Sequence, residues 1–555
     1  MEKTILIGGA AGQGSAVTSH FIGKIFCHLG FYVFNYRDYP SLIRGGHNFN
    51  ILTVSSRPVL SQKEKYDIIL AFDQKTIDLH QDKLNKGGVI FGNKNLKSER
   101  LHPIDIGSIL AKIGGPKILE NDILIGALFK HVGADTGILM KEAEREFPRN
   151  NELIKKAIEE GYNLVESREG TAHRDSSVFA PIAGKAKYFL SGTDGVALGA
   201  IAAGLDIYFA YPMTPATPLL NFFAKNQSKY NILTLQLEDE ISVVNAALGA
   251  SFGGAKVMVG TSGGGFALMT EALSLAGMAE LPVVIYLGQR TAPSSGIPTY
   301  TGQSDLKFAL NAGHGEFLKI VSAPGDPEEA IFRTQEAFYL SLKYRTPAII
   351  LSDKHLAESD YSFDEISRSP LAIQKLSPEE IPENYKTYQI TKNGISPVAF
   401  PGQGKIVRVN SYEHDEEGNT TESPIWSEKM NDKRFMKLPY LEKEVDKFHP
   451  VSVYGKGKNL IIGWGSTKGA IIDALPELKN YRFLQISYIS PFPRKQVIKE
   501  IKKSKKIILV ENNVTGLLGD IIAEQTGFII KNKVLKYDAR PFTVEYLINK
   551  IRTMK

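Results

Sequence analysis

Short apolar runs alternate with stretches of helical periodicity along most of the chain, and this alternation restricts the fold more than any other feature. Near the N-terminus, the apolar run 4–7 is followed by the glycine-rich segment 8–14. Hydrophobic residues then recur at helical spacing, and they are Val17, Phe21, Ile22, Ile25 and Leu29. Strands and helices that alternate in this way form open, mostly parallel sheets. The sequence therefore predicts an α/β protein built on several such sheets.

The chain divides into four expected segments, because 555 residues are too many for a single hydrophobic core. Further apolar runs predict strands at 31–34, 67–72, 88–91, 206–210, 256–260, 282–286, 348–352, 460–465 and 506–510. We expect one α/β domain over 1–180 and a second over 187–365, with a polar linker at 166–177. An irregular connection over 366–450 would then lead to a third α/β domain over 456–555.

Composition excludes several classes of protein. The single cysteine, Cys27, rules out an intrachain disulfide and also a four-cysteine iron–sulfur site within the chain. The net charge of +6 comes from 66 basic and 60 acidic residues; it is too small to predict nucleic-acid binding, although it favours docking of an acidic partner. No apolar run is long enough to span a membrane, and the first residues show no signal-peptide pattern. We therefore expect a cytoplasmic protein with no membrane and no nucleic-acid partner.

Two polar motifs follow predicted strands in the second domain. Residues 211–215 read Tyr-Pro-Met-Thr-Pro, and the two prolines fix the loop that presents Thr214. Further along, three adjacent acids precede an apolar helix that should be buried, and the last of them is Glu240. A carboxylate in the first turn is stabilised by the helix dipole, which is the simplest explanation of Glu240. Three adjacent acids nevertheless exceed what capping requires and favour a further role.

Two more motifs follow in the same domain. Residues 261–266 read Thr-Ser-Gly-Gly-Gly-Phe after a strand, so the backbone there can approach a ligand closely, although a flexible turn explains the glycines equally well. Arg290 ends another strand, and a guanidinium suits a substrate carboxylate because it donates two parallel charge-assisted hydrogen bonds. Open α/β sheets bind ligands at the carboxyl ends of their strands, so we expect Arg290 and Thr214 on one edge.

Taken in order, these motifs resemble the pyrimidine-binding domain of the 2-oxoacid:ferredoxin oxidoreductase family. The family pattern is a Tyr-Pro-Ile-Thr-Pro loop, a Glu before an apolar helix, a Thr-Ser-Gly-Pro-Gly loop, and Gln-Arg with a Pro-Ser-Thr-Gly-Leu-Pro-Thr tail. This chain departs from it at Met213, Ala216, Gly264 and Ser295, and none of these changes removes a reactive group. The likeness continues through 303–306, 410–416, 420–422 and 540–543.

The N-terminal segment resembles the gamma domain of the same family, through Gly12-Gln13-Gly14 and the segment 41–47. Nearly the whole chain is thus covered, in the order gamma then alpha, as in family members with a fused large subunit. The resemblance implies a thiamine-diphosphate pyrimidine-binding domain followed by a transketolase C-terminal-like domain.

The resemblance also implies an enzyme that oxidatively decarboxylates a 2-oxoacid with coenzyme A, giving acyl-CoA, CO2 and reduced ferredoxin. Glu240 would hydrogen-bond the aminopyrimidine ring of thiamine diphosphate, whereas Thr214 and Arg290 would hold the substrate. Further cofactor contacts would come from Tyr211, Pro212, Ser262 and Gly263, and coenzyme A contacts from Gly12 and Gly14. Whether pyruvate, 2-oxoglutarate or a branched-chain oxoacid is preferred stays open, and the fused architecture favours 2-oxoglutarate or a broad specificity.

The resemblance further implies a heterodimer. The chain has no Gly-Asp-Gly followed by Asn, the pattern that binds Mg²⁺ and diphosphate, and Cys27 alone cannot hold a cluster. Mg²⁺ and a [4Fe-4S] cluster are therefore expected on a separate beta subunit, with ferredoxin as a further partner. We expect no metal site in this chain, because Glu413-His414-Asp415 is more typical of a hydrogen-bonded loop.

Three alternatives stay open at this point. A nicotinamide-dependent dehydrogenase is one, although the spacing of Gly9, Gly12 and Gly14 differs from G-x-G-x-x-G. A transketolase-like protein or 2-oxoacid dehydrogenase beta component is the second, and Arg290 and the N-terminal domain argue against it. The third is a non-catalytic assembly subunit, which activity assays with and without a beta subunit would distinguish.

Overall fold

The computed structural model describes residues 1–40, 46–149, 151–164, 187–368, 371, 373 and 381–554. The predicted linker at 166–177 and residues 41–45 of the gamma-like motif lie outside this part of the chain. The described residues form two compact units. Unit 1 contains Met1–Leu190, Glu358–Ser367 and Thr543–Asn549, and unit 2 contains Ser191–Ala357, Arg368–Phe542 and Lys550–Lys555.

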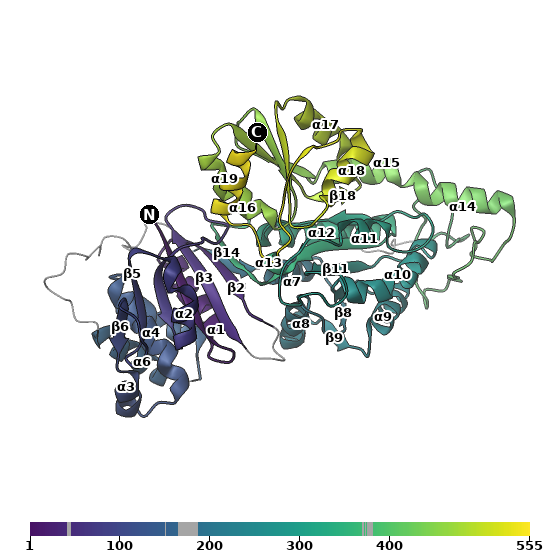
Figure 1. Cartoon of the computed structure of the whole chain (residues 1–555). Helices are drawn as coiled ribbons and strands as arrows, with labels where there is room; N and C mark the ends of the chain where they lie inside the picture. The colour runs from purple at the N-terminus through teal and green to yellow at the C-terminus, as the bar shows by residue number, and fades with distance from the viewer. Residues whose placement is uncertain are drawn as a thin grey trace. The chain divides into compact units, whose positions relative to one another are not determined.

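Unit 1 is built on an eight-stranded sheet with the order β6-β5-β4-β1-β3-β2-β14-β7. Figure 1 labels β2, β3, β5, β6 and β14 of this sheet. Its strands are β1 (Glu2–Ala10), β2 (Tyr32–Asp38), β3 (His47–Ser55), β4 (Tyr66–Ala71), β5 (Leu84–Asn93), β6 (Leu101–Ile104), β7 (Tyr188–Ser191) and β14 (Asp360–Phe363). Strand β1 pairs parallel with β4 on one side and antiparallel with β3 on the other, and these ladders extend it through Gly8 and Gly9. The turn after β1 is therefore shorter than the glycine-rich segment suggested.

Helices complete unit 1, and they are α1 (Ser15–His28), α2 (Gln74–His80), α3 (Ile106–Ile113), α4 (Glu120–His131), α5 (Thr136–Glu146), α6 (Asn151–Leu164) and the start of α19 (Val544–Thr553). Helix α1 buries Phe21, Ile22 and Ile25, as its periodicity predicts. Val17 is the exception, since 59% of its surface is exposed at the start of this helix.

Unit 2 contains two sheets. The larger has seven strands in the order β18-β12-β13-β11-β10-β8-β9. These are β8 (Ile207–Ala210), β9 (Leu233–Gln236), β10 (Val257–Thr261), β11 (Val284–Gln289), β12 (Ile320–Ser322), β13 (Ala348–Asp353) and β18 (Tyr488–Ser490). All of its pairings are parallel except that between β12 and β18. Its helices are α7 (Gly192–Ala202), α8 (Thr217–Tyr230), α9 (Glu240–Phe252), α10 (Gly263–Met278), α11 (Leu306–Asn311), α12 (Pro327–Tyr344) and α13 (Lys354–Glu358).

The smaller sheet of unit 2 has five strands in the order β15-β17-β16-β19-β20. These strands are β15 (Val451–Tyr454), β16 (Asn459–Gly463), β17 (Tyr481–Ile486), β19 (Ile507–Glu511) and β20 (Asn532–Leu535), and the helices are α16 (Thr467–Ala474), α17 (Arg494–Lys502) and α18 (Leu517–Thr526). Only the edge strand β15 runs antiparallel to its neighbour. The described residues thus form an α/β protein. The sheets of unit 2 are mainly parallel, whereas the sheet of unit 1 combines parallel pairs over β6-β5-β4-β1 with antiparallel pairs over β1-β3-β2-β14.

The segment between residues 365 and 450 differs from the irregular connection expected, because its last part forms α14 (Pro424–Met436) and α15 (Leu438–Asp446). Lys433 of α14 and Lys437 at its C-cap point into the interior. There, both ammonium groups donate hydrogen bonds to the carboxylate of Glu280, which lies just beyond α10. Arg345 donates to the Glu280 carbonyl oxygen over 3.2 Å. We call these four residues the Glu280 cluster.

No helix in the part of the chain that the structure describes is long and apolar enough to cross a membrane.

Candidate active site

Four neighbouring parallel strands of the seven-stranded sheet, in the order β11-β10-β8-β9, end at one edge, and a sequence motif follows each of them. Arg290 follows β11, Ser262 follows β10 and Tyr211 follows β8. The acids that lead into Glu240 follow β9. The fold thus brings motifs that are up to 80 residues apart to the carboxyl edge of one sheet, where ligands bind to open α/β sheets.

Glu240 is a buried carboxyl group that its helix does not need as a cap. Asp239 is the N-cap of α9 and accepts a hydrogen bond from the Ser242 amide over 2.7 Å. Glu240 is only 3% exposed, and its Oε1 has no hydrogen-bond partner among the described residues. Burial raises its pKa above the ordinary value, and the charge of Asp239 acts in the same direction. An unpartnered buried acceptor is costly unless a ligand supplies the donor.

The start of α10 requires glycine because two carboxyl groups lie against it. A Cβ at Gly265 would stand 2.4 Å from Glu240 Oε1, and a Cβ at Gly263 would stand 2.6 Å from Asp305 Oδ2. Both distances are shorter than side-chain contacts permit, so these glycines allow the two acids to approach. Between the strand and these glycines, the Ser262 hydroxyl is buried, and no group in the described residues bonds it. The turn therefore presents polar atoms that the described residues leave unsatisfied.

Arg290 connects two of the loops at this edge. Its guanidinium donates to the carbonyl oxygen of Thr214 over 3.0 Å and is half-buried. Burial lowers the pKa of Arg290, whereas the negative charge of Asp305 raises it. The guanidinium keeps further N–H donors beyond the one given to Thr214. Thr214 contributes its main chain to this contact, and Tyr211 and Pro212 precede it in the same loop, with Tyr211 38% exposed.

Asp305 is a site residue that the sequence reasoning missed. It stands at the N-cap position of α11, and an Asp directly before a helix is ordinarily explained as a cap. Its carboxyl group caps nothing and instead lies at Gly263. Burial raises the pKa of Asp305 to about 6, with Arg290 lowering it in part. The only signal in the sequence was its place in the family-like segment 303–306.

Gly12 and Gly14 belong to unit 1 and form a separate candidate region. Both have left-handed backbone conformations, with φ of 91° and 82°, that side-chain-bearing residues rarely adopt. Asn121 in α4 donates from its side chain to the Gln13 carbonyl oxygen over 2.7 Å, which fixes the turn between these two glycines. A side chain of α4 therefore stabilises this turn, in addition to the strand β1 and the helix α1 that the turn connects.

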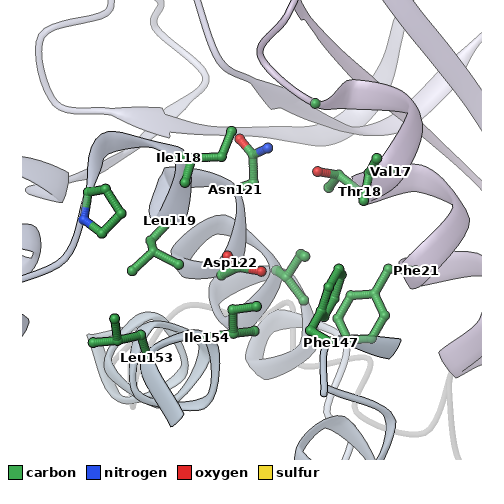
Figure 2. Close-up of a pocket in the computed structure, with 13 residues that line it drawn as sticks. Val17, Thr18, Phe21, Ile118, Leu119, Asn121, Asp122, Phe147, Leu153 and Ile154 are labelled. Carbon is green, nitrogen blue, oxygen red and sulfur yellow. The ribbon is translucent and has the colours of Figure 1, made fainter. Parts of the chain in front are cut away.

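A pocket of about 340 Å³ opens beside Gly14 (Figure 2). Its walls are mostly apolar, and the lining residues include Val17, Phe21, Ile118, Phe147 and Ile154. Figure 2 shows the Asp122 carboxyl group among these apolar side chains. Burial raises the pKa of Asp122 to about 7. The exposed Val17 thus contributes to a pocket wall.

The remaining candidate, His414, lies in a hydrogen-bonded loop. Its Nδ1 is 3.0 Å from the Tyr412 carbonyl oxygen, and its ring stacks on Tyr388 with the ring centres 3.8 Å apart. In the residues that the structure describes, no three His, Cys, Asp or Glu side chains gather in a way that could hold a metal ion.

Comparisons with known proteins cover both units. Residues 198–432 match the family described as pyruvate flavodoxin/ferredoxin oxidoreductase, thiamine diphosphate-binding, and residues 4–164 match the family described as pyruvate ferredoxin/flavodoxin oxidoreductase. A 2-oxoacid:ferredoxin oxidoreductase subunit alpha from a Sulfolobus species is 33% identical, over 98% of this chain and 95% of the relative. The 2-oxoglutarate synthase subunit KorA of Methanothermobacter marburgensis is 29% identical over 66% of this chain and 99% of its own length.

A solved structure is similar over almost the whole chain. It is the 2-oxoglutarate:ferredoxin oxidoreductase from Magnetococcus marinus with 2-oxoglutarate, coenzyme A and succinyl-CoA bound. The TM-score is 0.90 at 28% identity, and the match covers 99% of each chain.

Proposed function

Because this chain belongs to the family of 2-oxoacid:ferredoxin oxidoreductase alpha subunits, we propose that it catalyses, with a beta subunit, the CoA-dependent oxidative decarboxylation of a 2-oxoacid. The products are acyl-CoA, CO2 and reduced ferredoxin. The observation that carries the proposal is the buried Oε1 of Glu240, which has no partner among the described residues, at the sheet edge where Arg290 follows β11. Family membership favours this function over the nicotinamide-dependent and transketolase-like alternatives.

The residues at the edge fit one half of thiamine diphosphate, the cofactor named in the matched family description. When bound, this cofactor supplies the carbanion chemistry that decarboxylation of a 2-oxoacid requires. Glu240 would accept a hydrogen bond at Oε1 from the protonated ring nitrogen of the aminopyrimidine, and its carboxylate would stabilise the positive charge of that nitrogen. Tyr211, Pro212, Ser262 and Gly263 would form the surrounding wall, with the Ser262 hydroxyl as a second unsatisfied polar group.

Arg290 and Thr214 would bind the substrate. Arg290 would donate to the substrate carboxylate while its bond to the Thr214 carbonyl oxygen holds the guanidinium in place. The Thr214 hydroxyl would contact the oxo or carboxylate oxygen. The half-buried setting of Arg290 strengthens this electrostatic contact, because water screens it less than at an exposed site.

A separate beta subunit would supply what this chain lacks. The chain has one cysteine, Cys27, which is buried. A cluster and a diphosphate-bound Mg²⁺ would therefore lie on the partner, which would pass electrons to ferredoxin.

The domains that we expect in this chain are a gamma domain over 1–180, a pyrimidine-binding domain over 187–365, a connection over 366–450 and a C-terminal domain over 456–555.

Coenzyme A would bind with the help of unit 1. The amides of the turn at Gly12 and Gly14 suit phosphate groups, because this turn leads directly into the N-terminus of α1. The pocket beside Gly14 offers apolar walls of a size that suits part of such a ligand. The Magnetococcus marinus structure, with coenzyme A bound, supports a role for this ligand in the related enzyme.

The test is co-purification of the chain with a beta subunit that carries Gly-Asp-Gly and several cysteines. Ferredoxin reduction is measured with pyruvate, 2-oxoglutarate and a branched-chain 2-oxoacid, each with and without coenzyme A. We expect reduction only when a 2-oxoacid and coenzyme A are both present. A complex that contains the cofactor and the cluster but reduces no ferredoxin with any 2-oxoacid would contradict the proposal.

A further inference from the structure

The main chain of Asp305 is held independently of its carboxyl group. Its amide donates to the Gln289 side-chain oxygen over 3.0 Å, and the same Gln289 side chain donates to the Ser352 carbonyl oxygen over 3.0 Å. Gln289 is fully buried. The start of α11 is therefore anchored to two strand ends without any cap from Asp305, and structural capping does not explain this carboxyl group.

The carboxyl group is turned toward the candidate active site. It lies at Gly263 and makes no cap hydrogen bond to α11, and Asp305 as a whole is 9% exposed. The charged group that acts on its titration is Arg290 at the end of β11. Of the other nearby acids and bases, Glu240 at the start of α9 lies at Gly265, and Lys307 in α11 pairs with Asp520 over 2.7 Å.

Asp305 is the negative group of this chain whose charge acts on the Arg290 guanidinium, and a bound substrate carboxylate would be a second. With Asp305 ionised, its negative charge offsets part of the positive charge of Arg290, and the site attracts an anion weakly. With Asp305 protonated, Arg290 is an uncompensated cation in a partly buried setting. An anionic substrate binds better to this second state, because a like charge close by disfavours both anions.

We propose that Asp305 is a positioning residue that controls how the 2-oxoacid carboxylate reaches Arg290, and that Asp305 takes one proton from solvent when the substrate binds. This inference rests on the proposed function and adds a specific residue and a proton to it. No covalent bond other than that to the proton is made or broken in this step, and the substrate carboxylate becomes the counter-charge of Arg290.

The proton uptake gives the substrate affinity a defined dependence on pH. The pKa of Asp305 is raised to about 6 without substrate, and a bound anion raises it further. Below about pH 6 the carboxyl group is already protonated, so KM is flat. Above about pH 6, KM rises by up to roughly tenfold per pH unit, until the pKa of the complex is reached.

The experiment compares the wild-type complex with Asp305→Asn in ferredoxin reduction between pH 5.5 and 8. Asparagine imitates the protonated state, so we expect a flat KM profile and a KM at pH 8 about tenfold below that of the wild type, with kcat changed less than twofold. Asp105→Asn in unit 1, at an exposed N-cap that accepts from the Ser108 amide, is the matched control and should keep the wild-type profile.

Two results would overturn the inference while leaving the proposed function intact. One is a wild-type KM that is flat from pH 5.5 to 8, a measurement that needs no variant. The other is an Asp305→Asn complex with a raised KM and the wild-type slope, which would make Asp305 a structural support of Arg290. A wild-type complex that reduces no ferredoxin with any 2-oxoacid would instead remove the proposed function and this inference together.

Discussion

Unit 2 contains two glutamates that are almost equally buried, Glu240 at 3% and Glu280 at 1% exposure, in opposite electrostatic settings. The carboxylate of Glu280 forms a salt bridge with Lys433 over 2.5 Å and another with Lys437. Burial alone would raise the pKa of Glu280, but the two lysines lower it well below the ordinary value. No described lysine or arginine pairs with Glu240 in this way, and burial raises the pKa of Glu240.

The difference separates a structural carboxylate from one available to a ligand. Glu280 is satisfied within the chain and ties the segment before residue 450 to the end of α10. Glu240 has an acceptor that no described residue satisfies. This arrangement costs free energy of folding unless a ligand supplies the donor. The same residue type at the same depth thus has opposite functions, which depend on the cations brought nearby.

The largest expected effect is on catalysis at Glu240. Glu240→Gln keeps the shape but removes the negative charge, so we expect kcat to fall by roughly a thousandfold in the complete complex. The measurement is steady-state ferredoxin reduction, together with the exchange rate of the C2 proton of bound thiamine diphosphate. Exchange at the wild-type rate would show that Glu240 only begins a helix, and the contrast with Glu280 would have no functional meaning.

Glu280→Gln should have the next largest effect, and it should be on stability. The substitution leaves Lys433 and Lys437 buried without their counter-charge, which costs about 3–5 kcal/mol in comparable buried pairs. Denaturant unfolding of the full chain measures the loss, with the exposed Glu442→Gln as the control. A loss below about 1 kcal/mol would mean that the Glu280 cluster contributes little.

Arg290→Lys tests whether Arg290, like Glu240, serves a ligand and binds the substrate carboxylate. Lysine keeps the charge but not the planar fork, so about 1.5–3 kcal/mol is lost and kcat/KM falls roughly ten- to a hundredfold. Thr214→Val should act in the same direction more weakly. Kinetics with several 2-oxoacids are the measurement, alongside a cofactor titration that should change little. Values within twofold of wild type for every substrate would make Arg290 a support for the Thr214 loop.

The smallest expected effect is the pH dependence of stability, and it should have opposite signs at the two glutamates. The raised pKa of Glu240 means that its contribution is present below the unfolded pKa and is lost as pH rises through the folded pKa. Glu240→Gln should therefore raise the free energy of unfolding by about 1 kcal/mol at pH 7 and change it little at pH 4. Because the pKa of Glu280 is lowered, its carboxylate contributes stability above the unfolded pKa, and this contribution is lost as pH falls through the folded pKa.

Thermal unfolding of both variants across this range checks the signs. If Glu240→Gln destabilised the chain at pH 7, the ionised carboxylate would have a partner, and the contrast between the glutamates would fail.

The edge that carries Arg290 could be predicted from the sequence because strand ends are readable from apolar runs, and parallel strands place their carboxyl ends together. Asp305 could not be predicted, since only tertiary contacts show that it turns away from its helix. Helix α14 was missed for a related reason. The buried positions of α14 include Lys433 and Arg434, so the apolar periodicity that indicates a helix is weak there.

The pairing of β2 with β14 has a consequence for synthesis of the chain. Asn35 and Phe34 in β2 lie opposite Asp360 and Tyr361 in β14. A ribosome that adds about 5–20 residues per second needs roughly 15–65 s to translate the intervening sequence. Throughout this interval the outer edge of β2 has unpaired N–H and C=O groups that can pair with strands of other nascent chains. Slower elongation before residue 360 would lengthen this period of exposure, and a chaperone that covers the edge would shorten it.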